Sequence, residues 1–318
     1  MTRRMFAGGL TPIGFVDFFK YIMPLDAAKK RYFLKGASGS GKSTFIKKIA
    51  EKFDGASTDI DFFHCANDAS GLDGLAVKDL GFCIIDATSP HSHDPEIPSA
   101  IDEIIDFAEF LDSEKLTEHI DEIKKLLESK KELYKNAQKF LTAAGSVRTA
   151  DRAAYEATVQ RSRVRDYARE YLNGPETYGA GTDRKLFLSA ITPAGLVNFA
   201  EDVLSRYNVY DICAKAGSNV FLDEMKCIAN SRGINTESFF SPLEPTKREY
   251  LLLPEEGLAF SATHSICSKP EIIKTLLDAA TEFMKEALVI HGKIEEIYID
   301  KMNFDKVNEL TEKILNRL

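Results

Sequence analysis

The 318-residue sequence contains no tryptophan, no C-x-x-C pair and no apolar run near the roughly 18 residues that a membrane-spanning helix needs. Its five cysteines are an odd number without metal-site spacing, which indicates reduced thiols rather than a disulfide scaffold. The N-terminal segment is basic but lacks the apolar core of a secretory signal. We therefore expect a cytoplasmic protein with no membrane partner.

Positive charge is also scarce, because 41 Lys and Arg stand against 49 Asp and Glu and give a net charge of -8. This balance argues against broad electrostatic binding of nucleic acid. The 44% hydrophobic and 28% charged content is typical of a soluble globular chain, and 318 residues are enough for two domains with separate cores.

The segment FLKGASGSGKSTFIKKIA, which starts at Phe33, contains G-x-x-x-x-G-K-[ST], the pattern of a phosphate-binding loop. The stretch RYFLK before the glycines predicts a strand, and Phe45, Ile49 and Phe53 after them have helical spacing. A strand, a glycine-rich turn and a helix N-terminus point successive backbone N–H groups at phosphate oxygens. The segment therefore predicts a binding site for ATP.

The residues predicted to bind the nucleotide are those of the loop and of the helix start, namely Gly36, Ala37, Ser38, Gly39, Ser40, Gly41, Lys42, Ser43 and Thr44. We expect Lys42 to reach the β- and γ-phosphates and the Ser43 hydroxyl to bind Mg²⁺. Asp86 ends the apolar run FCII and is the second expected ligand of Mg²⁺. Lys42 and Asp86 are thus the predicted catalytic residues, with ATP and Mg²⁺ as cofactors.

Acidic and histidine side chains follow the predicted strand DIDFFHC. Asp68 and Asp73 are either turn residues or groups at the carboxyl end of that strand, where α/β sheets bind ligands. In a phosphoryl-transfer reaction an acceptor would lie near Asp68, Asp73 or His91, and one of the two aspartates would act as base. Ala87 stands where many motor-type ATPases place a glutamate after the metal-binding acid, which favours a kinase or a slow, gated ATPase.

A metal site is a further alternative for four residues that are close in sequence but match no known zinc spacing. They are His64, Cys65, His91 and His93. Zinc binding and ordinary packing both stay open for them.

The sequence also repeats itself. RRMFAGGLTPIGFVDF, from Arg3, returns as RKLFLSAITPAGLVNF, from Arg184, at an offset of 181 residues. The likeness continues downstream at falling offsets, and at an offset of 143 Phe140 meets Phe283 and Val164 meets Val307. The change in offset leaves about 32 extra residues in the charged stretch after Ile97. The pattern predicts a duplicated α/β unit with a helical insertion in its first copy.

The second copy has lost the nucleotide motif. On a gapless count Phe221, Leu222 and Asp223 replace Gly41, Lys42 and Ser43, and Ser261 replaces Asp86. The second unit is therefore expected to be a scaffold or regulator. The basic residues nearest its degenerate site are Lys215, Arg232, Lys247 and Arg248. They are either surface cations or a source of one group, first of all Arg248, for the phosphate site of the first unit.

Apolar residues between Ile101 and Leu141 recur at helical spacing among charged residues, which predicts amphipathic helices. These helices either form a hairpin on their own domain or an arm for a dimer or another partner.

Five segments together make the chain similar to a poorly characterised group of bacterial tandem P-loop proteins, labelled ATPases or nucleotide-kinase-like. They are FAGGLTPIGF, YFLKGASGSGKSTFIKKIA, FHCANDASGLDG, IIDATSPHSHDP and IYIDKMNFDKV, and the likeness spans nearly the whole chain. The resemblance implies ATP binding by Lys42, Ser43 and Asp86 and leaves the substrate open. The chain departs from the group in its degenerate second loop and at Asn303, where the group favours aspartate.

The sequence thus predicts an α/β fold of two tandem P-loop NTPase-like modules with parallel sheets and helical extensions. Residues 1–178 form the active module, with a helical arm over about 98–178, and residues 179–318 form the degenerate one. The expected function is slow ATP hydrolysis. The alternatives are a kinase for a small molecule, nucleoside or nucleotide, and an ATP-gated binding or regulatory protein. The expected partners are a nucleoside triphosphate and either a small acceptor or a protein, and the arm could join a homo-oligomer.

Overall fold

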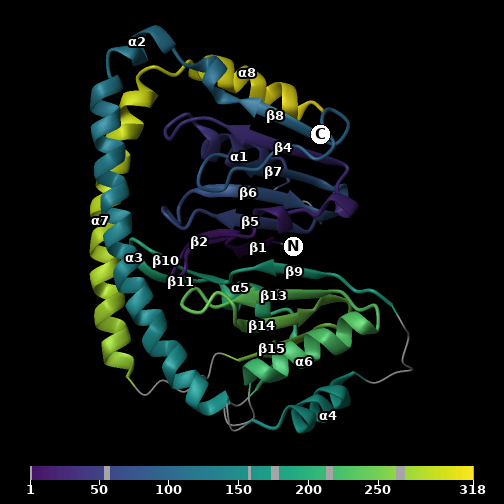
Figure 1. Cartoon of the computed structure of the whole chain (residues 1–318). Helices are drawn as coiled ribbons and strands as arrows, with labels where there is room; N and C mark the ends of the chain where they lie inside the picture. The colour runs from purple at the N-terminus through teal and green to yellow at the C-terminus, as the bar shows by residue number, and fades with distance from the viewer. Residues whose placement is uncertain are drawn as a thin grey trace.

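The computed structural model describes residues 2–53, 58–156, 159–172, 179–212, 218–262 and 269–317, with the side chains of 154–156 left out. The chain is α/β, with two larger sheets, two short hairpins and several helices (Figure 1). No helix in these ranges combines the length and the apolar character needed to cross a bilayer.

The first sheet has six strands, in the spatial order β1 (Thr2–Met5), β5 (Ile60–His64), β6 (Leu72–Val77), β7 (Phe82–Asp86), β4 (Lys30–Lys35) and β8 (Asp102–Asp106). The second sheet has five, in the order β9 (Asp183–Leu186), β13 (Thr236–Phe240), β14 (Arg248–Leu253), β15 (Leu258–Ser261) and β12 (Asn208–Asp211). Apart from β8, strand order and relative strand direction agree position by position between the sheets.

Both sheets are mixed, whereas the sequence predicted parallel ones. β6 and β14 each run antiparallel to both of their neighbours. β6 returns beside β5 after a tight turn, in which the backbone N–H of Ser70 donates to Asp68 Oδ1 at 3.0 Å. A short turn of this kind can join only antiparallel strands, because a parallel neighbour needs a long crossover. Asp73 therefore lies in β6, and its interpretation as a turn residue was wrong.

Two small hairpins lie between the sheets and the long helices (Figure 1). They pair β2 (Gly8–Thr11) with β3 (Gly14–Asp17) and β10 (Ser189–Thr192) with β11 (Gly195–Asn198). The same side-chain hydrogen bond closes the turn of each hairpin. Thr11 Oγ1 donates to the Gly14 carbonyl at 2.7 Å, and Thr192 Oγ1 donates to the Gly195 carbonyl at 2.9 Å.

The helices are α1 (Lys42–Glu51), α2 (Ser113–Thr117), α3 (Ile120–Glu156), α4 (Arg161–Tyr171), α5 (Ala200–Leu204), α6 (Ser218–Ser231), α7 (Pro270–Ile299) and α8 (Phe304–Leu315). Single 3₁₀ turns occur at Phe19–Tyr21, Leu25–Ala27, Lys78–Leu80, Phe107–Phe110 and Pro254–Glu256. Asn303 caps α8, because its side chain accepts the backbone N–H of Lys306 at 3.2 Å. Asparagine and aspartate cap helices about equally well, so Asn303 keeps the local structure.

Residues 101–111 were expected to be helical, and this expectation was wrong for β8 and the 3₁₀ turn after it. The Arg31 guanidinium donates to both carboxylate oxygens of Asp102, at 2.7 and 2.9 Å, and ties β8 to β4. Ile105 is buried and its neighbour Ile104 is 48% exposed, which is the alternation of an edge strand.

The predicted helical arm is a pair formed by α3 and α7, which run side by side along one flank of both sheets (Figure 1). The rings of Phe140 and Phe283 stack between the two helices with centroids 5.8 Å apart. Ala137 and Ala280 are fully buried in the same seam. The partner of α3 is thus a helix from the other half of the chain, and the predicted hairpin on its own domain is wrong.

The helix that follows each member of this pair packs on the sheet of the other half of the chain. α4 lies against α6, and Val164 shares a core with Phe221 of the second sheet's layer. α8 lies beside α1, and Val307 shares a core with Phe45 of the first sheet's layer. Packing therefore does not follow the predicted division at 178/179, which itself adjoins a stretch outside the described residues.

A further core joins the two sheets where β1 and β9 face each other. Met5 and Phe63 from the first sheet and Leu186 and Phe239 from the second are all fully buried in it. Apolar burial on this scale stabilises the contact by about 1.5–3 kcal/mol for each large side chain.

Candidate phosphate-binding site

The phosphate-loop motif connects β4 to α1, as its sequence predicts. Gly39 and Gly41 have φ values of 77° and 91°, a region that side chains with a Cβ rarely enter. α1 begins at Lys42, directly after Gly41, and the Gly41 carbonyl accepts the backbone N–H of Phe45 at 2.8 Å. The first N–H groups of the helix therefore have no helical partners and face the loop, which suits an anion.

Lys42 is buried and folded into this loop. Its Nζ donates to the carbonyls of Gly36 and Ala37, both at 2.8 Å, and lies 3.7 Å from Asp86 Oδ2. Because these two carbonyls are neutral, they do not neutralise the ammonium, which can still bind a further anion.

Asp86 ends β7 next to β4, opposite Leu34. Its Oδ1 accepts the backbone N–H of Thr88 at 3.0 Å, and the Thr88 hydroxyl donates to the Gly36 carbonyl at 3.2 Å. The acid and the loop are therefore held together at the carboxyl ends of two parallel strands, where sheets of this class bind ligands. The sequence predicted Asp86 at the end of a buried strand, and β7 ends there.

The Ser43 hydroxyl turns toward β6 and accepts the backbone N–H of Leu72 at 2.9 Å. Ser43, an expected Mg²⁺ ligand, thus contacts the residue that precedes Asp73 in the chain. The Ser40 hydroxyl is buried inside the loop and has no hydrogen-bond partner among the described residues. An orphaned hydroxyl beside free N–H groups fits a loop that is completed by a polar ligand.

Asp73 lies in β6, and its strand pairs with the strand of Asp86. Burial raises the pKa of Asp73 to about 6, the carboxylate of Asp86 adds to the effect, and the positive charges of His91 and Lys42 oppose it. Burial and the Asp73 carboxylate likewise raise the pKa of the Cys65 thiol. A carboxyl group that titrates near neutrality beside the loop is a candidate proton acceptor.

His91 is fixed from both sides. Its ring stacks on Phe19 at a centroid distance of 4.2 Å, and its Nδ1 lies 2.7 Å from the carbonyl of Asp86. A carbonyl only accepts, so Nδ1 carries the proton. Nε2 then faces the Asp73 carboxylate at 4.0 Å, so the imidazole lies between this acid and the backbone carbonyl of Asp86.

The four proposed zinc ligands bind different partners. Nδ1 of His64 lies 2.7 Å from the Ala69 carbonyl, Cys65 contacts Asp73, and His93 Nε2 lies 3.1 Å from Asp17. Within the described ranges no three His, Cys, Asp or Glu side chains are grouped to hold a metal ion. Asp68 is exposed and accepts from Ser70, as expected of a turn residue.

The structure adds residues that the motif did not indicate. α7 lies directly on the loop, because a Cβ placed on Gly39 would be 2.7 Å from the carbonyl oxygen of Glu295. Ser38 Oγ is 3.5 Å from His291 Nδ1, which in turn accepts from Lys130 Nζ of α3 at 2.8 Å. These residues lie about 90 to 260 positions from the loop in sequence, and no local pattern could have placed them there.

Among the described residues, the corresponding positions of the second unit have no lysine and no acid, but the gapless count identified the wrong residues. β6 pairs Gly74 with Ile85, and β14 pairs Tyr250 with Ser261. This register sets Ser261 against Ile85 and therefore Ala262 against Asp86. Ser218 begins α6 as Lys42 begins α1, and we compare the two helices from these first residues.

Counted from the helix starts, Phe221 and Leu222 also lie away from the loop. Both are fully buried core residues of α6, as Phe45 and Ile46 are in α1. They fill the helix face against the sheet, so the predicted blocking of the loop by their bulk was wrong.

Arg248 does not reach the phosphate loop. Its guanidinium binds Asp223, its Nε donates to Ser238 Oγ at 2.8 Å, and its Nη2 lies 3.4 Å from Asp183 Oδ2. All three partners belong to the second sheet and its helix. Lys215 lies outside the described residues.

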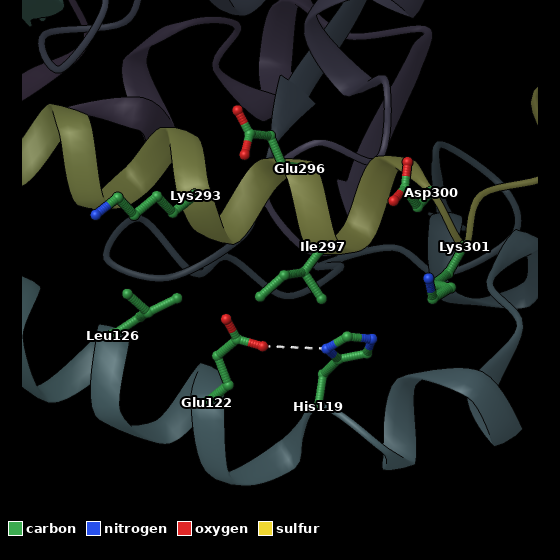
Figure 2. Close-up of a pocket in the computed structure, with 8 residues that line it drawn as sticks. All are labelled: His119, Glu122, Leu126, Lys293, Glu296, Ile297, Asp300 and Lys301. Atoms are coloured by element: carbon green, nitrogen blue, oxygen red, sulfur yellow. Dashed lines mark hydrogen bonds and ion pairs between the residues drawn. The ribbon is translucent and has the colours of Figure 1, made fainter.

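A cavity of about 440 Å³ opens elsewhere, between the N-terminal part of α3 and the C-terminal part of α7 (Figure 2). Its lining residues are His119, Glu122, Leu126, Lys293, Glu296, Ile297, Asp300 and Lys301. Figure 2 shows Leu126 and Ile297 pointing toward each other, and His119 Nδ1 lies 3.1 Å from Glu122 Oε2. None of the predicted site residues lines this cavity, and its mixed charges favour no particular ligand.

Comparison of the chain with family models, with curated proteins and with solved structures gave no match.

Proposed function

We propose that the chain binds ATP with Mg²⁺ at residues 36–44 and hydrolyses it slowly. The observation that carries the proposal is the position of Lys42, whose ammonium lies inside the glycine loop and 3.7 Å from Asp86. A cation, free helix N–H groups and an acid for the metal are the parts that phosphoryl chemistry needs.

The residues present suit Mg²⁺, which prefers oxygen ligands and keeps several waters. Ser43 and Asp86 would hold the ion, and the ion would neutralise charge on the β- and γ-phosphates. For this the Ser43 hydroxyl has to turn from the N–H of Leu72 toward the ligand. Lys42 would exchange its two loop carbonyls for phosphate oxygens.

Asp73 supports a second candidate, transfer of the γ-phosphate to a small acceptor. Its carboxyl group has a pKa of about 6, lies 4.0 Å from His91 Nε2 and is near enough to Asp86 and Lys42 to feel both charges. A base with that pKa suits removal of a proton from an acceptor hydroxyl. Ala87, in place of a water-activating glutamate, is consistent with transfer and with slow hydrolysis.

We further propose that the fold is a tandem P-loop NTPase-like pair in which only the first unit binds nucleotide. The shared strand order and the matching register of β6 and β7 with β14 and β15 support the duplication. In this view each unit takes its outer helix from the other half, α8 in the first unit and α4 in the second.

Titration with a non-hydrolysable ATP analogue in the presence of Mg²⁺ tests the binding proposal. We expect one site per chain, lost in Lys42→Ala and kept in the control Lys47→Ala, which changes an exposed lysine on the same helix. Binding that survives Lys42→Ala would remove the proposal.

Product analysis separates the two reactions. ADP formation that depends on an added nucleoside, nucleotide or sugar selects the kinase. Slow phosphate release that no acceptor accelerates selects the ATPase. Absence of both, with binding intact, selects an ATP-gated binding protein.

A further inference from the structure

The C-terminal part of α7 lies on the phosphate loop with no space between them. A Cβ on Gly39 would lie 2.7 Å from the Glu295 carbonyl oxygen, 3.0 Å from its Cα and 3.1 Å from Cγ1 of Ile299. A Cβ on Gly41 would lie 3.2 Å from the ring of Phe304. Gly39 thus permits the helix backbone to approach the loop more closely than any other residue would.

Polar contacts bind the same surfaces together. Lys130 Nζ donates to His291 Nδ1 at 2.8 Å, so Nδ1 is an acceptor and Nε2 carries the ring proton. Nε2 lies 3.5 Å from the Glu295 carboxylate, and this carboxylate is close enough to the backbone N–H of Gly39 for the N–H dipole to lower its pKa. A chain of contacts therefore runs from α3 through α7 to an N–H group of the loop.

The charges of this contact suit a state without nucleotide. Burial raises the pKa of Glu295, and the carboxylate of Asp68 raises it further, while Lys130 opposes them. Burial lowers the pKa of His291 to about 4, and Lys130 and Lys42 add to that effect. Burial and the nearby acid make the ionised form of Glu295 less stable at this position, and a ligand that displaces the carboxylate into water would remove this destabilisation.

A bound triphosphate would compete with Glu295 directly. Phosphate oxygens need the loop N–H groups, and the Glu295 carboxylate already lies beside the N–H of Gly39. The negative charges of the phosphates would also repel Glu295. The same loop cannot hold both ligands.

We propose that residues 291–299 of α7 form a roof over the phosphate loop, which Glu295 holds closed and a nucleoside triphosphate opens. The roof is part of the α3–α7 pair, and this pair flanks both sheets (Figure 1). Opening would therefore carry the nucleotide state of the first sheet to the second. The proposal rests on nucleotide binding at residues 36–44 and adds its regulation.

Removal of the carboxylate provides the first test. Glu295→Ala is expected to tighten binding of a non-hydrolysable ATP analogue about tenfold, which corresponds to about 1.4 kcal/mol. Glu296→Ala is the matched control, because this exposed neighbour lines the cavity between α3 and α7 and not the phosphate loop, so the affinity should be unchanged. Equal or weaker binding by Glu295→Ala would overturn the roof.

A reversible cross-link provides the second test. Ser38→Cys with His291→Cys replaces two side chains that are 3.5 Å apart and fastens α7 to the loop. The oxidised form is expected to lose at least tenfold in affinity and to recover it on reduction. Phe140→Cys with Phe283→Cys joins α3 to α7 away from the loop and should bind equally well in both redox states.

The outcomes distinguish the two proposals. Unchanged affinity in the oxidised Ser38/His291 cross-link would overturn the roof and leave ATP binding in place. Absence of binding in the wild type, in Glu295→Ala and in both reduced double variants would overturn nucleotide binding, and the roof with it.

Discussion

Phe6 and Phe187 exchange two backbone hydrogen bonds across the contact between the sheets, with N···O distances of 2.9 and 3.0 Å. The contacts around them come in matched pairs. Phe18 stacks on Phe187 at 5.0 Å, and Phe6 stacks on Phe199 at 5.1 Å. Since Phe18 and Phe199 also correspond in the sequence repeat, equivalent residues build both sides of this contact.

Charged residues next to this contact should contribute strongly to stability. Arg3 is buried and donates to Asp61 at 2.7 and 2.8 Å and to Glu237 at 2.6 and 3.0 Å. Arg184 and Lys78 complete the cluster. Arg3→Leu would leave two buried carboxylates short of a cation, and we expect the free energy of unfolding to fall by about 3–5 kcal/mol in urea titrations.

Arg4→Leu is the control for this variant. The Arg4 side chain is 50% exposed and pairs with Asp202. An exposed pair is expected to contribute less than about 1 kcal/mol. If both variants lose a similar amount of unfolding free energy, the buried cluster contributes no more to stability than an exposed ion pair does.

Asp73 should lower the free energy of unfolding at neutral pH, where its buried carboxyl group is ionised. Its folded pKa of about 6 lies above the ordinary value of 3.8, so the native state binds the proton more tightly than the unfolded state does. Its contribution is therefore favourable below about pH 4 and is lost as the pH rises through 6. The shift of about two pKa units sets an upper limit of about 3 kcal/mol for this loss.

Asp73→Asn is accordingly expected to raise the free energy of unfolding by about 1–3 kcal/mol at pH 7.5 and to change it little at pH 4. The same variant should lose acceptor-dependent ADP formation if Asp73 is the base. Denaturant titrations at both pH values measure the effect. Asp94→Asn, with a 95% exposed side chain, should be neutral at both, and a neutral result for Asp73 as well would contradict the buried-acid interpretation.

The sequence predicted those parts of the site that depend on neighbours in the chain. Gly39, Gly41 and Lys42 form a loop because a strand, positive φ angles and a helix start follow one another. Asp86 was found because a buried strand ends at it. The turn near Asp68 was seen too, but its turn residues concealed the start of β6, where Leu72 begins a nearly continuous buried run.

Contacts between distant parts of the chain could not be predicted in the same way. Amphipathic spacing in α3 indicates that one face is buried, but it does not say that α7 provides the cover. Burial of Val164 and Val307 in the opposite cores follows from this pairing, not from either helix alone. The repeat did mark these two valines as equivalent, and they occupy comparable buried positions in α4 and α8.

Since α4 and α8 each pack on the sheet of the other half of the chain, a charge placed in either helix should destabilise only that sheet's layer. Val307→Asp buries a charge against α1, so hydrogen exchange should accelerate in α1 and β4 and much less in α6 and β14. Val164→Asp should give the reverse pattern, because α4 packs on α6. Exchange that accelerates equally in both layers in either variant would contradict the assignment of each helix to one sheet.

Leu222 separates the two interpretations of the second unit's degenerate loop. The gapless count places it where a lysine would bind phosphate, whereas the structure places it, fully buried, in the core with Phe260. Leu222→Ala should therefore lower the free energy of unfolding by about 2–5 kcal/mol, as expected for a cavity in a packed core. ATP-analogue titration should still give one site per chain with unchanged affinity. Cys227→Ser, at an exposed position of the same helix, should change neither quantity. A Leu222→Ala variant with full stability would place this side chain outside the core, and a changed number of sites would mean that the second unit binds nucleotide after all.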